Sequence, residues 1–577
     1  MKQEELIKQI DGQNLVVIPL GGQSELGQVL WVISYQGKMI IIDAGAAYPN
    51  RELPGVDLQL PNTSFLEAHQ ENIEALLLTS GNEEYIGAVP YLLKHITIPK
   101  IMAPKFISCL LEQTKSNLPS DHPLNNIKIE NVETKQVYPL GPFEVEWIRV
   151  NDAVAQACAL RVATREHEMV YMTTYKLDQT PVDHQLTDIA RFAQLGEEGV
   201  TLLIGSSAGV ERTGYSESEL VLYERLYGRI KDAKGRVLVL MSGTNTYRLQ
   251  TLIEIAKRCD RKILLLGDSL VHCAVASTMT GNLAYQQELE VSLDNLSKTA
   301  DNRLLVIATG KEGNPMPALT ELANGTHKFL KAKADDTIIY SSEIPPGRLR
   351  QMAMLLDQFL LLGIKVYWGE EHGMHVPRTA SQEELKLALS LIKPKYFIPA
   401  FGEGRHIMHH AKLAHEWGMP QSDIFPLQNG QVFSIVSGSA VLKGRAEYQA
   451  VLVNREHGER ITTFTVNERR AMSLEGLITI SLIFDSNRAL VSGPNFGCSA
   501  ASFRYSIQWK DACVEMTKNI TEALENQINE KQSQSEKMDE VAIRAVVRDA
   551  AFKTLRAHLQ TKPVLQIVIQ QLDGVKK

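Results

Sequence analysis

Three groups of side chains in this sequence have the types and spacing of metal ligands. Glu83 and Glu84 stand together in a polar loop, and His406 and His410 stand four residues apart in GEGRHIMHHAKLAHEW. Carboxylates and imidazoles bind divalent ions, and residues four apart share one face of a helix. The segment EEHGMH, from Glu370 to His375, offers a third group. Because no acidic ligand accompanies His406 and His410, the sequence favours surface histidines over a metal site built from these groups.

The polar loop lies between a predicted strand and a predicted helix. In IEALLLTSGNEEYIGAVPYLL, residues 73–93, the apolar run Ala75–Leu78 has the length of a buried strand. Apolar residues then recur at helical spacing from Ile86, which predicts an amphipathic helix. Ligands collect at the carboxyl ends of strands in open α/β sheets, so Ser80–Tyr85 occupies the position of an active site. Its residues include neither histidine nor cysteine.

Length and composition predict a soluble protein of several domains. The chain has 577 residues, 44% hydrophobic and 22% charged, with a net charge of −7. This charge does not indicate nucleic-acid binding, although a local basic groove remains compatible with it. The N-terminus lacks the apolar core of a signal peptide, and no apolar run has the length of a membrane span, which predicts a cytoplasmic protein without membrane contact. Six cysteines without a CxxC pair are expected to be reduced and buried.

The pattern of strands and helices predicts an α/β protein with one domain inserted into another. From 206 to 369, helix candidates around 218–233, 248–259, 269–280 and 347–362 alternate with apolar strands, which indicates a parallel sheet covered by helices. We therefore predict a first domain over 1–205 that resumes over 370–447. The remainder, 448–577, reads as a connector and a small α+β domain: the strand GLITISLIF, a Gly-rich turn, two polar helices flanking QSQSEK, and the strand VLQIVIQQL.

Several stretches, in their common order, resemble the ribonuclease J family. They are GGQSELG, IIIDAG, GVDLQLPNTSFL, LLLTSGNEEYIGAVPYLL, YKLDQTP, VERTGY, TGKEGNPMPALT, SQEELKLALSLIKPKYFIPAFGE and GPNFGCSAASF. The resemblance implies a metallo-β-lactamase αββα sandwich, an inserted β-CASP domain and a C-terminal domain.

Active members of that family are metal-dependent RNA hydrolases, which hold two divalent ions such as zinc or manganese with a His-x-His-x-Asp-His loop and three further ligands. All seven ligand positions are changed here: they are Ser80, Asn82, Glu84, Tyr85, Asp152, Thr174 and Phe401. Two carboxylates without imidazoles make at best a loose Mg²⁺ or Ca²⁺ site. The resemblance therefore implies no catalytic residue, no metal and no cofactor. Asp43, which supports the metal ligands in the family, is expected to hold the turn after its strand.

The family's RNA-contacting positions are also altered. They fall on Arg248, Ser341, Ser342, His375, Val376, Pro377, Arg378 and Thr379. Arg378 suits either a phosphate contact or a solvated position, and the serine pair suits either a phosphate contact or a cap. Tyr247 replaces a family histidine and suits either stacking on a base or packing.

The leading hypothesis from the sequence is a non-catalytic subunit of a ribonuclease J-type RNA decay and maturation complex. By resemblance, its partners would be an active ribonuclease J paralogue, a second copy of itself, or RNA. The first alternative is residual metal-dependent RNA hydrolysis, using Glu83, Glu84, Asp152 or the histidines. The second alternative is an independent RNA-binding protein that uses the cleft between its two main domains.

Overall fold

Apolar runs at the start of the chain form the central strands of the first sheet. β1 (Leu15–Gly21), β3 (Leu30–Tyr35) and β4 (Lys38–Ile42) are almost fully buried. A strand covered on both faces needs apolar side chains on both, which explains their continuous hydrophobic sequences. β4 leads into β6 (Ile73–Leu77) in the parallel direction, so both strands end at the same edge of the sheet. The site described below lies at this edge.

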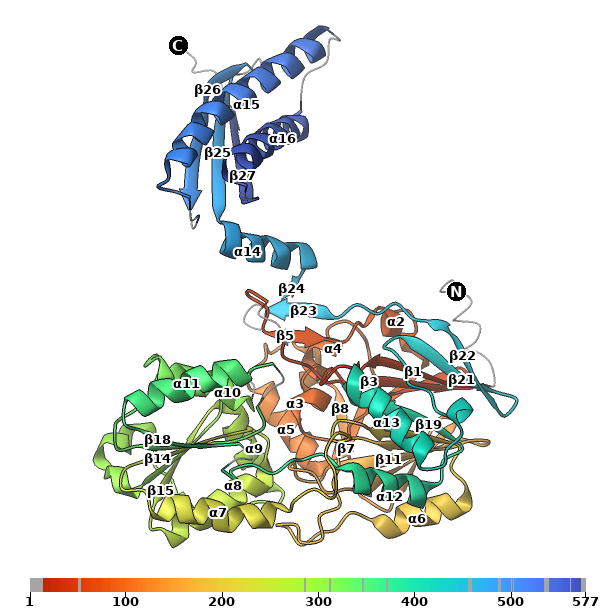
Figure 1. Ribbon diagram of the computed structural model, residues 1–577. Helices are drawn as coiled ribbons and strands as arrows, with labels where there is room; N and C mark the ends of the chain where they lie inside the picture. The colour runs from red at the N-terminus through yellow and green to blue at the C-terminus, as the bar shows by residue number, and fades with distance from the viewer. Residues whose placement is uncertain are drawn as a thin grey trace. The chain divides into compact units, whose positions relative to one another are not determined.

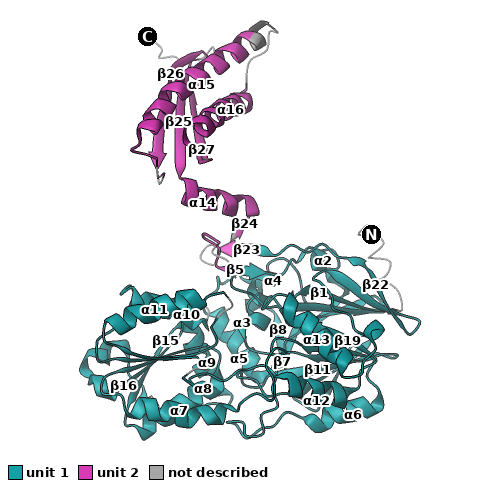
Figure 2. Cartoon of the chain, viewed as in Figure 1, with its two compact units in different colours: residues 1–50, 58–451 teal, residues 51–57, 452–577 magenta. Residues whose placement is uncertain are grey.

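The computed structural model of the protein describes most of the chain and divides it into two compact units. The described residues are 14–49, 53–284, 287–310, 313–344, 347–369, 372–454, 459–485, 489–499, 501, 503–533, 539–560 and 562–571. The first unit comprises 1–50 with 58–451, and the second comprises 51–57 with 452–577 (Figure 2). The domain boundaries at 205, 369 and 447 stay predictions from the sequence.

Two sheets pack face to face in the first unit and enclose its main core. In the first sheet the order is β22 (Ser439–Arg445), β21 (Gln431–Val436), β1, β3, β4, β6, β7 (Lys100–Pro104), β8 (Lys128–Val132). In the second it is β19 (Tyr396–Ala400), β13 (Leu202–Ser206), β12 (Glu168–Met172), β11 (Cys158–Ala163), β10 (Phe143–Arg149), β9 (Val137–Leu140). Trp31 and Ile40 of the first sheet share one apolar cluster with Trp147, Leu160 and Ile398 of the second.

Helices cover the outer faces of these sheets and complete a four-layer sandwich. α6 (Ile189–Glu198), α12 (Gln382–Ile392) and α13 (Gly404–Glu416) pack against the second sheet. α5 (Lys105–Lys115) packs against β7 and β8 of the first sheet. This αββα arrangement is the metallo-β-lactamase fold predicted from the sequence.

A second, five-stranded parallel sheet domain leaves the sandwich after β13 and returns before β19. Its order is β15 (Lys262–Leu266), β16 (Leu304–Ala308), β14 (Val237–Met241), β17 (Thr337–Ser341), β18 (Lys365–Trp368). α7 (Glu219–Lys231), α8 (Thr246–Arg258) and α9 (Asp268–Met279) cover one face. α10 (Pro315–Ala323) and α11 (Leu349–Leu361) cover the other (Figure 1). The parallel sheet and four of these helices match the prediction, whereas α10 was not predicted.

The second unit contains a three-stranded sheet with two long helices on one face. The sheet order is β26 (Leu490–Ser499), β25 (Leu477–Phe484), β27 (Val564–Gln571), and its apolar face packs on α15 (Ile507–Ser533) and α16 (Glu540–Leu559). The expected Gly-rich turn is wrong over 490–499, because this stretch pairs with β25 as a strand despite register shifts. The connector contains β23 (Val451–Asn454), β24 (Glu459–Ile461) and α14 (Thr463–Glu475).

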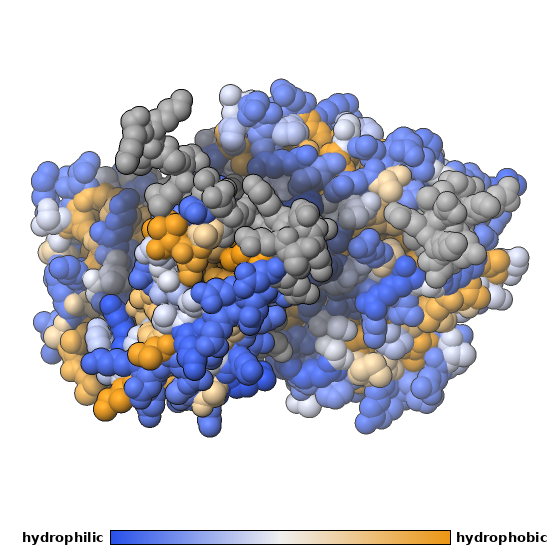
Figure 3. Space-filling model, turned by 90° about the horizontal axis from the view of Figure 1, so that it is seen from above, coloured by the Kyte–Doolittle hydropathy of each residue, from blue (hydrophilic) through white to orange (hydrophobic). Residues whose placement is uncertain are grey.

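One face of the molecule is largely hydrophilic, with hydrophobic residues in small groups (Figure 3). Among the described residues, no helix combines the length and apolarity needed to cross a bilayer. All six cysteines are free, but only Cys158 and Cys273 are buried, so the expectation of six buried cysteines is wrong for the other four.

Candidate functional site

The loop after β6 keeps the backbone of a ligand-binding loop. Asn82 caps α3 (Glu83–Ile86) by accepting a hydrogen bond from the Glu84 N–H at 3.2 Å, and α4 (Val89–Leu92) follows after a break. The single helix expected from Ile86 is therefore wrong. Pro90 lies in the first turn of α4 and has no N–H to donate to the preceding turn, so one continuous helix would lose a hydrogen bond there.

The neighbouring loop after β4 holds the backbone of residues 83–85 through hydrogen bonds. The Ala44 N–H donates to the Tyr85 carbonyl at 2.7 Å, and the Ala46 N–H donates to the Glu83 carbonyl at 3.0 Å. Between them, Gly45 lies so close that a Cβ atom would come within 1.5 Å of the Glu84 carbonyl oxygen. The glycine of IIIDAG is therefore required by the close approach of two loops.

Asp43 ties the ends of two strands together instead of holding only its own turn. Its buried carboxylate accepts hydrogen bonds from the Thr79 N–H at 2.9 Å, from the Thr79 hydroxyl at 2.8 Å and from the Tyr171 hydroxyl at 3.1 Å. Burial raises the pKa of Asp43 to about 7, and these three donors oppose the rise. The residue thus keeps a supporting position beneath the loop, with Thr79 and Tyr171 as its partners.

Three of the seven changed ligand positions form a packed back half of the site. The Tyr85 hydroxyl is hydrogen-bonded to the Thr174 hydroxyl, and burial raises the pKa of Tyr85. The Phe401 ring packs against Trp31 and Tyr171, with ring centroids 5.9 and 5.3 Å apart. Tyr85 and Phe401 belong to the apolar core between the sheets. Aromatic rings and a hydroxyl pair therefore stand where the resemblance implies metal ligands.

Two further positions form a charged front half. Glu84 makes an ion pair with Arg378, which comes from the segment that returns from the five-stranded sheet. Asp152 is buried, and one of its carboxylate oxygens accepts a hydrogen bond from the Ala153 N–H at 2.6 Å. Burial raises the pKa of Asp152 to about 6, against the attraction of Arg378 and the Ala153 N–H. Glu84 and Arg378 line an open cavity of about 260 Å³.

The side chains of Ser80 and Asn82 form hydrogen bonds within the loop after β6. Ser80 is buried, and its hydroxyl accepts a long hydrogen bond of 3.4 Å from the Asn82 N–H. Because the Asn82 side chain serves as the helix cap, both residues stabilise the loop conformation.

The expected RNA-contacting residues are largely engaged by one another. Arg248 is buried and bonds the Glu219 carboxylate at 2.7 Å, the Ser341 carbonyl at 2.6 Å and His375 Nδ1 at 3.1 Å. The Ser341 hydroxyl donates to the Met374 carbonyl at 2.6 Å. Both side chains therefore have protein partners, and both also line the cavity, so their phosphate contacts stay predictions.

The other members of this group differ in their surroundings. Burial and the positive charge of Arg248 lower the pKa of His375 well below its usual value. Val376 is fully buried, and Pro377 is half-buried. Thr379 accepts hydrogen bonds from Arg212 through its hydroxyl and its carbonyl. Ser342 lies on the cavity wall beside Arg248 and His375.

Arg378 and Tyr247 also have protein partners. The partner of Arg378 is Glu84, so this arginine is more than a solvated side chain. Because Arg378 also lines the cavity, its phosphate contact stays a prediction. The Tyr247 hydroxyl donates to Asp183 at 2.7 Å, in agreement with a packed position. These partners lie far away in the sequence, and no local pattern indicated them.

The histidines of α13 do not form a metal site. His406 and His410 are buried, which corrects the expectation of surface histidines. His410 Nδ1 is 3.0 Å from the Ser207 hydroxyl, and burial lowers the pKa of His410 to about 3. His406 Nε2 lies 3.3 Å from Glu211, while its Nδ1 accepts from the Glu403 N–H. Glu370 of the other predicted group lies outside the described residues.

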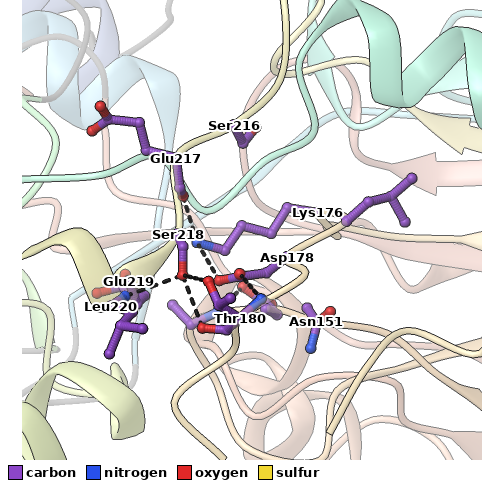
Figure 4. Close-up of polar contacts among 12 residues, drawn as sticks. Asn151, Lys176, Asp178, Thr180, Ser216, Glu217, Ser218, Glu219 and Leu220 are labelled. Carbon is purple, nitrogen blue, oxygen red and sulfur yellow. Dashed lines mark hydrogen bonds and ion pairs between the residues drawn. The ribbon is translucent and has the colours of Figure 1, made fainter. Parts of the chain in front are cut away.

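The segments that join the sandwich to the five-stranded sheet are tied together by polar contacts. The buried Glu384 carboxylate on α12 accepts hydrogen bonds from the N–H groups of Leu177, Ser216 and Ser381 at 2.6, 2.9 and 2.7 Å. Leu177 belongs to the stretch YKLDQTP, whose neighbourhood Figure 4 shows. This carboxylate therefore joins both crossing segments to one helix.

A second set of contacts reinforces the same crossing. Lys176 is buried, lies 3.7 Å from Asp178 and donates to the Glu217 carbonyl at 3.1 Å (Figure 4). Ser218, which caps α7, donates to the Thr180 carbonyl at 3.0 Å. These contacts hold the two crossing segments together beside the start of α7.

The donor set at the seven positions does not fit two divalent ions. A dinuclear centre needs several imidazole and carboxylate ligands that are free to bind it. Here one carboxylate is ion-paired with Arg378, and three positions are taken up by the packed back half. Among the described residues, no group of three or more His, Cys, Asp or Glu side chains is arranged to hold a metal ion.

Two family models match this chain. Residues 234–359 match the ribonuclease J β-CASP domain, and residues 464–572 match the ribonuclease J C-terminal domain. The first match lies over the five-stranded sheet, and the second covers the sheet and long helices of the second unit.

Similar proteins extend the likeness over nearly the whole chain. Ribonuclease J 1 of Streptococcus pyogenes serotype M3 is 30% identical over 481 residues, which cover 83% of this chain and 85% of the relative. Ribonuclease J2 of Bacillus subtilis is 28% identical and covers 98% of this chain and 100% of the relative.

A more distant likeness concerns the fold alone. The solved structure of a protein of unknown function from Enterococcus faecalis aligns with a TM-score of 0.52 and 15% identity, over 73% of this chain and 100% of that one. The αββα sandwich, the inserted parallel sheet and the 30% identity to ribonuclease J 1 agree: this chain belongs to the ribonuclease J family.

Proposed function

We propose that this chain is a non-catalytic member of its family, which acts as a subunit in RNA decay and maturation with an active ribonuclease J paralogue. The observation that carries the proposal is the replacement of the ligand set by the Tyr85–Thr174 pair, the Phe401 ring and the Glu84–Arg378 ion pair. The similar proteins are ribonucleases by name, which supports a role in RNA processing. We further propose that the protein is cytoplasmic and that it assembles with the active paralogue as a hetero-oligomer. We propose that it needs no metal cofactor.

Exposed apolar side chains support the assembly part of this proposal. In the second unit, six large apolar residues are more than two thirds exposed; they are Phe464, Leu474, Tyr505, Ile507, Val514 and Val541. On α11, Leu361 is 88% exposed and Leu349 is 62% exposed. Where such side chains adjoin one another, they form the kind of apolar surface that binds another protein.

The catalytic part is tested with the purified full chain and an RNA with a labelled 5′ end. We expect no cleavage above background with added Mn²⁺, Mg²⁺ or Zn²⁺, under conditions in which an active ribonuclease J degrades the RNA. Stoichiometric bound metal, with cleavage abolished by Glu84→Ala or Asp152→Ala, would contradict the proposal and establish residual hydrolysis.

The assembly part is tested by co-expression with an active paralogue. We expect both chains to elute together from a sizing column, and we expect the RNA products of the active chain to change when this chain is present. A chain that stays monomeric and leaves the products unchanged would refute a subunit role. The single substitution Phe464→Asp keeps the fold and probes one exposed apolar side chain of the second unit.

RNA holding without cleavage is a second candidate function, favoured by the cavity. Arg348 and Arg378 line it, together with Ser342 and Asn314. If RNA binds there through its phosphates, affinity in a filter-binding series falls as salt rises, and Arg348→Ala weakens it. Binding that is absent or insensitive to salt would remove this candidate.

A further inference from the structure

A cluster of charges beside the cavity, made of the half-buried Glu84 and Arg378 and the buried Asp152, is not explained by the family's chemistry. Glu84 and Asp152 are the two carboxylates that remain at the ligand positions, and Arg378 is the cation beside them. Arg378 attracts both: it is ion-paired with Glu84, and its charge lowers the pKa of Asp152. Burying carboxylates without a cation is costly, so the cluster needs this guanidinium.

The protein positions Arg378 through contacts on both sides of it. On one side, Arg248 holds His375, and Val376 is fully buried. On the other, Arg212 donates to the Thr379 carbonyl at 2.8 Å. Pro377 restricts the backbone directly before Arg378. The side chain therefore leaves a fixed stretch of backbone and reaches a loop 294 positions away in the sequence.

We infer that the Arg378 guanidinium replaces the family's divalent ions as the cation of this site and joins the returning segment to the loop after β6. The inference rests on the proposed non-catalytic role and identifies the group that makes it stable. A guanidinium carries a permanent charge and a planar set of donors, so it can bind a carboxylate without any metal.

The cluster also contains two buried polar atoms with no hydrogen-bond partner within the described part of the chain: Arg378 Nη1 and Asp152 Oδ2. They carry opposite charge, and they belong to the two residues whose attraction is described above. If Arg378 is the resident cation, its removal leaves Glu84 and Asp152 without a positive partner. Two such carboxylates are oxygen ligands of the kind that Mn²⁺ and Mg²⁺ prefer.

The test compares the full-length wild type with Arg378→Met, Arg378→Lys and the triple change Arg378→Met, Glu84→Gln, Asp152→Asn. Mn²⁺ binding is measured by electron paramagnetic resonance, and thermal unfolding is followed with and without Mn²⁺. Without the repulsion of a fixed positive charge, Arg378→Met should bind Mn²⁺ at least about tenfold more tightly than the wild type. Its unfolding midpoint should be lower than that of the wild type in chelator and should rise with Mn²⁺.

The other two variants separate the effect of the positive charge of Arg378 from the effect of its side-chain packing. Arg378→Lys keeps a positive charge and should gain no Mn²⁺ binding. The triple variant removes the uncompensated carboxylates, so its unfolding midpoint should recover toward the wild-type value without responding to Mn²⁺. An Arg378→Met chain that is as stable as the wild type, or that binds Mn²⁺ no better, overturns the inference.

If Arg378→Met does not fold, the triple variant still decides. A folded triple variant supports charge compensation, whereas a triple variant that is equally unfolded assigns Arg378 a packing role and overturns the inference. These outcomes are separate from the proposed function. That proposal fails if the wild type itself binds metal stoichiometrically and cleaves RNA.

Discussion

The back and front halves of the site differ in how each replaces the metal ligands. In the back half, Tyr85, Thr174 and Phe401 occupy the space with rings and a neutral hydrogen bond. In the front half, Glu84 and Arg378 keep charges and an open cavity. One half removes the room for an ion, and the other supplies a substitute for its charge. The difference predicts that the back half contributes chiefly to stability, while the front half retains the capacity to bind ligands.

Tyr85→Ala should produce the largest effect, because it removes a buried ring from the core between the sheets. We expect a loss of about 3–5 kcal/mol in the free energy of unfolding, measured by chemical denaturation. Tyr215→Ala is the matched control, because Tyr215 is 65% exposed; its loss should stay within about 0.5 kcal/mol. Equal losses in the two variants would show that the back half is not a packed core.

Asp43→Asn should change how stability depends on pH. The pKa of Asp43 is raised to about 7, above the value near 3.9 of an unfolded aspartate. Between these values the folded chain holds the extra proton, so the contribution of Asp43 to the free energy of unfolding falls as pH rises from about 4 to 7. The span is roughly 4 kcal/mol at most. Asp43→Asn should remove this contribution.

Asp152→Asn is the matched variant from the front half. The pKa of Asp152 is raised to about 6, so its contribution has the same sign but ends at lower pH. Between pH 6 and 7, Asp43→Asn should flatten the wild-type decline, while Asp152→Asn should leave it in place. Asp121→Asn, at an exposed carboxylate, should change neither part. The lowered pKa values of His375 and His410 act with the opposite sign, so the test is the difference between the wild type and Asp43→Asn. A difference in the free energy of unfolding that does not change with pH over 4–7 would contradict the assignment.

Glu84→Gln should give the smallest effect of these four substitutions. The Glu84 and Arg378 side chains are 34% and 21% exposed, so water weakens their ion pair. We expect a loss of about 1 kcal/mol, against no measurable loss for Glu133→Gln at an exposed position. A double-mutant cycle with Arg378→Met isolates the interaction energy. A coupling energy near zero would mean that the two charges do not act as a pair.

Local sequence patterns predicted most of the fold. The apolar runs of the five-stranded sheet and the helices between them were readable because their periodicities are clear and their ends carry turn residues. The sequence pattern did not predict α10, because its two prolines, Pro315 and Pro317, are more typical of turns. A proline nevertheless suits the first turn of a helix, and Asn314 caps this one. The sequence pattern did not predict β26 as a strand, because Gly493, Pro494 and Gly497 are typical of a turn.

The candidate site was predictable in its positions but not in its contacts. The ordered family motifs placed Tyr85, Thr174 and Phe401 at the former ligand positions. They did not show that two rings would join the core, since that depends on packing from both sheets. The partners of Arg248 and Arg378 come from segments far away in the sequence. No local pattern contains that information, so tertiary structure alone decides between a phosphate contact and an internal ion pair.

The aromatic filling of the back half also limits how this protein could change in evolution. Changing Phe401 alone to a histidine would exchange an apolar ring for a polar one within the core, next to Trp31 and Tyr171. The imidazole alone would bind no metal there. Tyr85 and Thr174 would also have to change, because their hydroxyls are hydrogen-bonded to each other and offer no metal ligand. A single change of this kind would therefore lower stability without creating a metal site. On the proposed non-catalytic role, packing would therefore oppose a return to hydrolysis, which would need several simultaneous replacements.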